Sequence, residues 1–215
     1  DYKKDMDIFK SQGMEVLYKE KKINDIAELV ISFNEGAETN PALGIAFEYL
    51  GYLGTEKMSA EEIASKMYEL ACSFSFGTYA NETRINVSGL GENVGEALEI
   101  VEDLIENAKA DEDILRSLKD DILKSRANSK LSQQHCFGAL RRYLTYGPEL
   151  ISKIYLNNDA VMALTSEQLL AMVKEMFAKQ HEILYYGPES EKALGKTLVA
   201  HHKVSDNPQP LEKRY

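Results

Sequence analysis

The chain has 215 residues, of which 44% are hydrophobic and 28% are charged, values that indicate one globular domain with a substantial core. Its formal net charge of −10 argues against a nucleic-acid partner, because contacts to phosphate groups require a basic surface. No stretch approaches the ~20 consecutive apolar residues of a membrane-spanning helix, so we expect no membrane segment.

The first half of the chain mixes strand and helix signals. Residues 14–33 predict a hairpin-like pair of strands, and residues 43–53 predict a helix. The run Ser59-Ala60-Glu61-Glu62 is a capping box that begins a second helix. Alternating polar and apolar residues then predict two further strands, at residues 72–78 and 84–90.

Helices dominate the second half of the chain. An apolar stripe predicts a helix over residues 93–108, and Asp111 caps a long helix that follows it. Residues 165–168 form another capping box, and residues 182–188 predict a strand that ends in a Gly-Pro turn. Together these elements predict an α+β fold, with helices packed on one face of a mainly antiparallel sheet.

Both ends of the chain have the composition of linkers. We assign residues 1–12 and 204–215 to linkers and residues 13–203 to a single domain. The segment Asp206-Asn207-Pro208-Gln209-Pro210 is rich in turn-forming residues. Linkers at both ends, with no initiator methionine, suggest a domain cut from a tandem array.

The most informative segment is Ile45-Ala46-Phe47-Glu48-Tyr49, which is followed by Gly54-Thr55. It resembles the zinc-binding helix of inverted-motif zinc peptidases, which reads His-x-x-Glu-His and runs into a Gly-Thr turn. In that motif two histidines hold the metal, and the glutamate is the base for the attacking water. Here Ile45 and Tyr49 stand at the histidine positions, and only Glu48 remains. Isoleucine cannot ligate zinc, and neutral tyrosine is a poor replacement for imidazole.

With the order of the predicted elements, this degenerate motif resembles one repeat of the M16 peptidase family, which includes insulinase and the mitochondrial processing peptidase. The resemblance covers nearly the whole chain and implies the LuxS/MPP-like metallohydrolase fold. It also implies a third ligand, a glutamate on the long helix, with another functional glutamate seven residues earlier. Counting from the Gly-Thr turn places these at Lys124 and Ser117, and residues 114–132 contain no glutamate. We therefore expect no catalytic residue and no metal site in this chain.

The space that a metal would occupy in such a motif is expected to be filled by neighbouring side chains. The rings of Tyr49 and Tyr52 pack well in such a space, and their hydroxyls can satisfy Glu48. If Lys124 occupies the ligand position, its ammonium is expected to compensate the Glu48 carboxylate.

The resemblance implies a role within a larger enzyme. M16 peptidases are built from repeated halves, one of which carries the zinc, so this chain is expected to be an inactive repeat in the wall of a peptide-enclosing chamber. Its partners would be other M16 repeats of the same protein, and zinc would lie in another domain. The alternative is a stand-alone scaffold that docks a zinc-bearing M16 partner. Residual activity from Glu48 stays open, and the substrate-binding residues are unknown. A Gram-negative source would imply the periplasm or the cell envelope.

Other reactive or aromatic groups have simpler interpretations. His135 and Cys136 are adjacent, and neighbouring side chains on a helix point in different directions, which disfavours a catalytic dyad. The cluster at residues 141–148 predicts a helix end with tyrosines packed beneath it. His181 begins a strand, and the pair His201-His202 adjoins a linker, where it could catch a stray metal.

Overall fold

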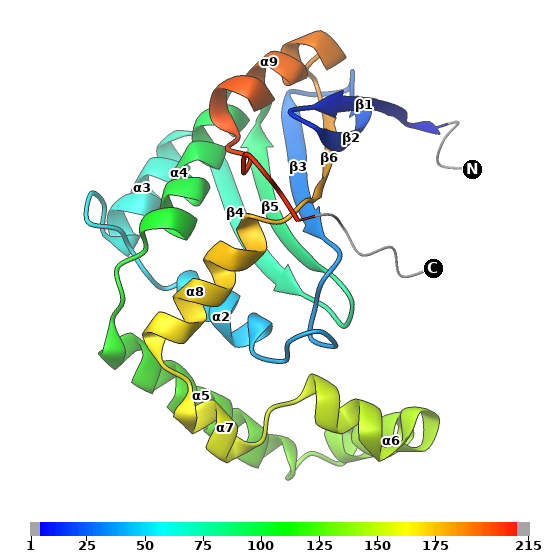
Figure 1. Cartoon of the computed structure of the whole chain (residues 1–215), viewed down its shortest axis with the longest axis vertical. Coiled ribbons are helices and arrows are strands. Elements are labelled where there is room, and N and C mark those ends of the chain that lie inside the picture. The colour runs from blue at the N-terminus through cyan, green and yellow to red at the C-terminus, as the bar shows by residue number, and fades with distance from the viewer. Residues whose placement is uncertain (1–4, 210–215) are drawn as a thin grey trace.

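The computed structural model describes residues 5–209, apart from the side chains of residues 150–152. Its strands are β1 (Asp7–Ser11), β2 (Met14–Glu20), β3 (Ile26–Phe33), β4 (Cys72–Thr78), β5 (Thr83–Leu90) and β6 (Glu182–Gly187). They form one six-stranded sheet with the order β1-β2-β6-β3-β5-β4 (Figure 1). Every neighbouring pair is antiparallel except β2 and β6, which run parallel. The predicted α+β fold with a mainly antiparallel sheet is therefore confirmed.

The sheet buries one face, because side chains along a strand point alternately to its two sides. Along β3, Ala27, Leu29, Ile31 and Phe33 are buried, while the residues between them are exposed or half-buried. The buried face carries the core of the domain, which the helices complete. The opposite face carries mostly polar residues, so a single layer of helices is sufficient to cover the apolar face.

The N-terminal boundary of the domain lies earlier than the sequence predicts. Asp7–Ser11 pairs with β2 through a hairpin whose turn residues, Gln12 and Gly13, have φ angles of 51° and 84°. Two consecutive positive φ angles are typical of a type I′ turn, whose twist matches that of paired strands. The assignment of residues 1–12 to a linker is therefore wrong for residues 7–12, and residues 1–4 lie outside the described part of the chain.

The predicted hairpin over residues 14–33 is also wrong in its pairing. Both strands form, as β2 and β3, but β6 lies between them. β6 runs parallel to β2 and antiparallel to β3, with Leu184 opposite Leu17 on one side and Val30 on the other. Local alternation predicts that a segment is a strand, whereas the neighbour of that strand depends on packing with distant segments.

The helices are α2 (Leu43–Leu50), α3 (Ala60–Glu69), α4 (Val94–Asn107), α5 (Glu112–Ser129), α6 (Gln133–Ile154), α7 (Asn158–Ala163), α8 (Ser166–Phe177) and α9 (Glu191–His201). A short 3-10 helix, Gly91–Asn93, precedes α4. Three of the helices, α3, α5 and α8, begin where their capping residues predict. Ser59 and Thr165 both form complete capping boxes, and Asp111 caps α5 through its carboxylate.

Helix α6 differs from the others because it lies away from the sheet (Figure 1). Gly147, with φ 73°, interrupts it immediately before Pro148. Between Gln133 and Tyr146 no side chain of α6 is buried. The predicted packing of tyrosines beneath this helix end is wrong, since Tyr143 and Tyr146 are both exposed.

The segment after α9 is attached to the domain. Residues 204–209 form no helix or strand, but Val204 packs against the core and the Gln209 carbonyl accepts a hydrogen bond from the Gln180 amide at 2.9 Å. The remainder of the linker assigned to residues 204–215 lies outside the described residues. Within residues 5–209 no helix is long and apolar enough to span a bilayer.

Candidate functional site

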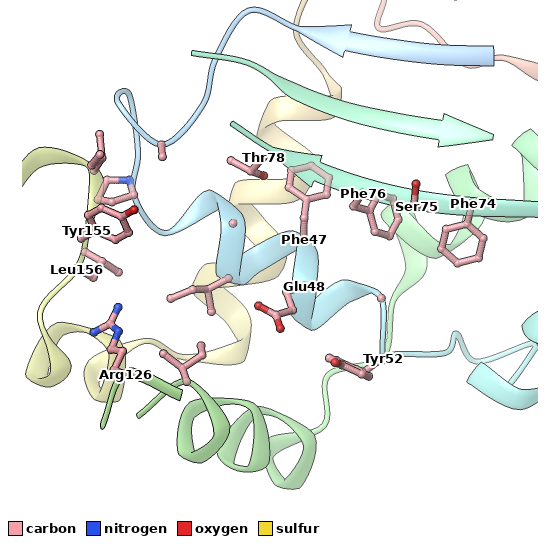
Figure 2. A pocket seen from close by; sticks show the side chains of 17 residues that line it. Phe47, Glu48, Tyr52, Phe74, Ser75, Phe76, Thr78, Arg126, Tyr155 and Leu156 are labelled. Carbon is pink, nitrogen blue, oxygen red and sulfur yellow. The ribbon is translucent and has the colours of Figure 1, made fainter. Parts of the chain in front are cut away.

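The degenerate zinc motif lies on α2, which packs against α8, β4 and the start of α5. Ile45 and Tyr49 face inward and are buried, whereas Glu48 is exposed. In Figure 2 the Glu48 side chain projects from α2 into a groove. Of the three positions that resemble the zinc motif, the helix therefore exposes one ionisable residue, Glu48, and the two others belong to the core.

Tyr49 connects the motif helix to the long helix. Its ring is fully buried, and its hydroxyl donates to the Asp111 carbonyl at 3.0 Å and accepts from the Asp111 amide at 2.8 Å. The Asp111 carboxylate in turn accepts from the amides of Asp113 and Ile114, which caps α5. Tyr49 fills the interior as predicted, but its hydroxyl satisfies the backbone of Asp111 instead of Glu48. Tyr52 is more than half exposed and does not fill the pocket.

The Glu48 carboxylate has no hydrogen bond or ion pair within the described part of the chain. Although the Glu48 residue is exposed overall, neighbouring side chains shield its carboxylate from part of the solvent, and this raises its pKa above the usual value for glutamate. A cavity of about 460 Å³ joins Glu48 to the first turns of α5 and contains three more carboxylates, those of Asp111, Asp113 and Asp121. No imidazole or thiol lines it, and among residues 5–209 no group of three potential ligands is placed to hold a metal.

Lys124 does not reach the motif. Its side chain is exposed, lies 3.6 Å from the Asp121 carboxylate, and lines neither of the two grooves that contain Glu48. The expected compensation of Glu48 by Lys124 is therefore wrong. Of the two positions counted on α5, Ser117 is the one that lies in the cavity with Glu48. Lys124 is seven residues further on, which is roughly 10 Å along a helix.

A larger groove of about 680 Å³ runs between α2, β4, α5 and the chain that follows α6 (Figure 2). Its wall on the sheet side is aromatic, with ring centroids 5.5 Å apart for Phe47 and Phe76 and 5.4 Å apart for Phe74 and Phe76. Arg126 and Tyr155 lie on the opposite side. β4 is the last strand of the sheet, so the groove lies beside a strand edge. The hydroxyl of Thr78, also in this wall, is buried without a hydrogen-bond partner.

The sequence did not single out the acidic residues of this site, although a signal for them exists. Asp113, Ser117 and Asp121 are spaced by four residues and therefore share one face of α5. What the sequence alone does not show is that this face is the one turned toward α2. Asp111 was identified only as a helix cap.

The histidines were also interpreted incorrectly. His202 is buried and hydrogen-bonded through both ring nitrogens, to His181 and to Glu102, so it is not available to a stray metal. His201 lies 3.0 Å from the Glu99 carboxylate. His181 and His202 are 21 positions apart, so local spacing in the sequence does not predict this contact.

No family model matches the sequence of this chain, and no curated protein matches it either. Solved structures match it in fold. An M16 peptidase inactive domain from Pseudomonas fluorescens superposes with a TM-score of 0.80 at 16% identity, over 95% of this chain and 52% of that one. The periplasmic protease PqqL from Escherichia coli gives a TM-score of 0.74 at 17% identity, over 100% of this chain and 26% of that one.

The ferredoxin protease FusC, solved in complex with Arabidopsis ferredoxin, gives a TM-score of 0.76 at 13% identity, over 98% of this chain and 24% of that one. This chain thus spans about half of the Pseudomonas protein and about a quarter of each of the two proteases. The match extends over nearly all of this chain in each case. The expected architecture is confirmed: the chain has the α+β fold of the domains found in M16 peptidases.

Proposed function

We propose that this chain is a catalytically inactive repeat of an M16-type zinc peptidase, in which it forms part of the wall that encloses the peptide. Zinc and the catalytic residues would lie in another repeat of the same protein. The observation that supports this most directly is the role of Tyr49, which stands at a ligand position of the motif. Its buried ring and paired hydroxyl stabilise the contact between α2 and α5, in place of a metal.

The large groove supports a role in holding peptide. It lies beside the edge strand β4, and an extended peptide can add to such an edge through backbone hydrogen bonds. The aromatic side chains of Phe74 and Phe76 offer apolar contacts, while Glu48 supplies a negative charge and Arg126 a positive one. A groove with these walls suits an extended segment that carries apolar side chains beside polar or charged ones.

A second function, docking of a zinc-bearing partner, is favoured by α6. Its exposed surface includes Phe137, Leu140 and Leu144, the last of which is 74% exposed. The sequence between Asp121 and Glu149 contains no acidic residue, and two of its basic residues, Arg141 and Arg142, lie on α6. An apolar helix with two arginines is complementary to an acidic and apolar surface, so we assign α6 as the surface that contacts a neighbouring repeat.

The test of inactivity uses the purified chain. After chelation and back-titration with zinc, elemental analysis is expected to show no stoichiometric metal, and dye-labelled casein is expected to remain uncleaved. One tightly held zinc per chain, together with cleavage that Glu48→Gln abolishes, would overturn the proposal.

The test of peptide binding uses a substitution that fills the groove without disturbing the core. A side chain added at Gly44 meets only the Thr78 Cβ at 3.9 Å, so Gly44→Leu extends into the groove from α2. This variant is expected to weaken the binding of dye-labelled casein peptides, as measured by fluorescence anisotropy. Gly138→Leu is the matched control, because no atom lies within 4 Å of the added carbon on α6. Equal binding by both variants would exclude the groove as the peptide site.

A further inference from the structure

Three ionisable side chains form a continuous hydrogen-bonded row inside the domain, remote from the motif helix. The His202 Nδ1 lies 2.6 Å from the Glu102 Oε1, and the Nε2 atoms of His202 and His181 are 2.8 Å apart. The row ends where the His181 Nδ1 lies 2.9 Å from the Lys179 carbonyl. The exposed fractions of Glu102, His181 and His202 are 1%, 2% and 4%, so these side chains are shielded from solvent.

Counting hydrogens shows what this row requires. A carbonyl only accepts, so the His181 Nδ1 must carry a hydrogen. A second hydrogen must lie between the two Nε2 atoms, and a third between the His202 Nδ1 and the Glu102 carboxyl. Two neutral imidazoles and an ionised carboxylate supply only two. The row therefore holds one additional proton, which makes the sum of its charges zero.

The burial of the row explains why one proton is held and not two. Burial, together with the neighbouring His202, lowers the pKa of His181 to about 4, which keeps that ring neutral. The additional proton therefore belongs to the contact between His202 and Glu102, where the carboxylate compensates it. The rings of Phe33 and Phe177 pack against His181, and the Phe177 ring also packs against His202.

Most of the charged groups around the row have ion-pair partners of their own. On the α4 side, Glu99 contacts His201, Asp103 contacts Lys57, and Glu106 contacts Lys203. After α8, Lys179 contacts Glu35. In β6, Glu182 lies opposite a second carboxylate, Glu15, and burial and this like charge raise its pKa. The direct contacts to the row from outside it are neutral: the Lys203 amide donates to the Glu102 Oε2 at 2.9 Å, and the Gln12 side chain donates to the His202 carbonyl at 2.9 Å.

We infer that Glu102, His202 and His181 form a buried binding site for a single proton. This proton stabilises the contacts of His202, at the end of α9, with Glu102 on α4 and with His181, which directly precedes β6. Loss of the proton would leave two ring nitrogens facing each other without a hydrogen and a buried carboxylate without compensation. The inference is independent of the proposed function, because it involves none of the residues of the motif or of the groove.

The proton count gives a specific dependence of stability on pH. Unfolded histidines have a pKa of about 6.5, so at pH 8 the unfolded row holds one proton fewer than the folded row, and stability falls as the pH rises. At pH 5 both unfolded imidazoles are charged and the unfolded row holds one proton more, so stability falls as the pH decreases. The contribution of the row is therefore largest at about pH 6.5.

The experiment measures protons released on unfolding by guanidinium in weakly buffered solution at pH 8. The intact chain is expected to release about one proton from the row, and its unfolding constant is expected to rise about tenfold per pH unit between pH 7.5 and 8.5. In Glu102→Gln the amide donates to His202 and still accepts from the Lys203 amide, so two neutral imidazoles complete the row. That variant is expected to release no proton.

The matched control is His201→Gln, which removes an adjacent histidine outside the row and is expected to leave the release unchanged. Hydrogen exchange of the Lys203 amide adds a local measurement, with loss of protection expected above pH 8 in the intact chain. Absence of proton release from the intact chain, or the same release from Glu102→Gln, would overturn the inference. If Glu102→Gln does not fold, the pH dependence of the intact chain decides the question alone.

Discussion

The Tyr49 hydroxyl and the Asp111 backbone exchange two hydrogen bonds, so a buried residue of α2 is joined directly to the N-cap of α5. We expect Tyr49→Phe to lower the free energy of unfolding by about 1 to 3 kcal/mol, because it leaves both backbone groups of Asp111 without this partner. Urea denaturation measures the change. Tyr52→Phe, at an exposed position one turn away, is the control and is expected to have little effect.

Restoring the two histidines is not expected to restore proteolysis. Ile45→His with Tyr49→His supplies two imidazoles, but catalysis also needs a third ligand, an open coordination position and groups that orient the ligands. The double variant is expected to bind zinc weakly and to leave casein intact. If the double variant cleaved casein faster than free zinc does, an isolated repeat would suffice for the reaction and the chamber-wall proposal would fail.

The position of the missing third ligand can be tested in that same background. Ser117 lies in the cavity with Glu48, whereas Lys124 is exposed and outside it. Adding Ser117→Glu is therefore expected to tighten zinc binding more than adding Lys124→Glu, as measured by competition with a chelating dye. The reverse order would mean that Lys124 is the ligand position after all.

Glu48→Gln is expected to stabilise the chain at neutral pH. Burial raises the pKa of Glu48, so the folded state favours the protonated form, and ionisation of this carboxyl disfavours folding. Between the ordinary glutamate pKa and the raised value the folded state binds more protons than the unfolded state, so stability falls as the pH rises. The difference between variant and parent is expected to vanish near pH 3 and to reach its full size at neutral pH in thermal unfolding. A constant difference across this range would contradict the assignment.

Substitutions on α6 are expected to weaken binding to a partner repeat while leaving the free energy of unfolding nearly unchanged. Leu140→Asp and Arg141→Glu change exposed side chains, so the free energy of unfolding should change by less than about 0.5 kcal/mol. Both should weaken binding to a zinc-bearing M16 repeat from the same protein, as measured by titration calorimetry. Val199→Asp, on the exposed side of α9, serves as the control. If the α6 variants bind the repeat with unchanged affinity, α6 is not the docking surface.

The secondary structure could be predicted from the sequence where the signals are local. Ser59, Asp111 and Thr165 each mark a helix start, and each forms the predicted cap. The two strands at residues 72–78 and 84–90 are predicted to within one residue, because their alternation of polar and apolar side chains is strong. In these segments the local pattern of side chains is sufficient to predict the conformation.

The arrangement of the site could be predicted only in part. Tyr49 fills the interior as predicted, whereas Glu48, which was expected in a filled pocket, faces out of the core. Ser117, and not Lys124, lies near Glu48 because of the position of α5 along its axis relative to α2. The sequence does not predict that position. The contact between His181 and His202 depends in the same way on the packing of α9 against α4, which follows from the whole core.

The position of β6 between β2 and β3 has a consequence for how this chain acquires its structure. Until residues 182–187 are available, the hairpin of β1 and β2 and the three-stranded unit of β3, β5 and β4 have no strand in common. The sheet can therefore close only after a segment near the end of this domain has been made, and its closure pairs residues 150 or more positions apart. Contacts of such separation slow folding and leave two hydrophobic strand edges open during synthesis. A ribosome-bound chain stopped before residue 182 would consequently expose both edges, which makes this interval the stage at which the nascent chain depends most on chaperones.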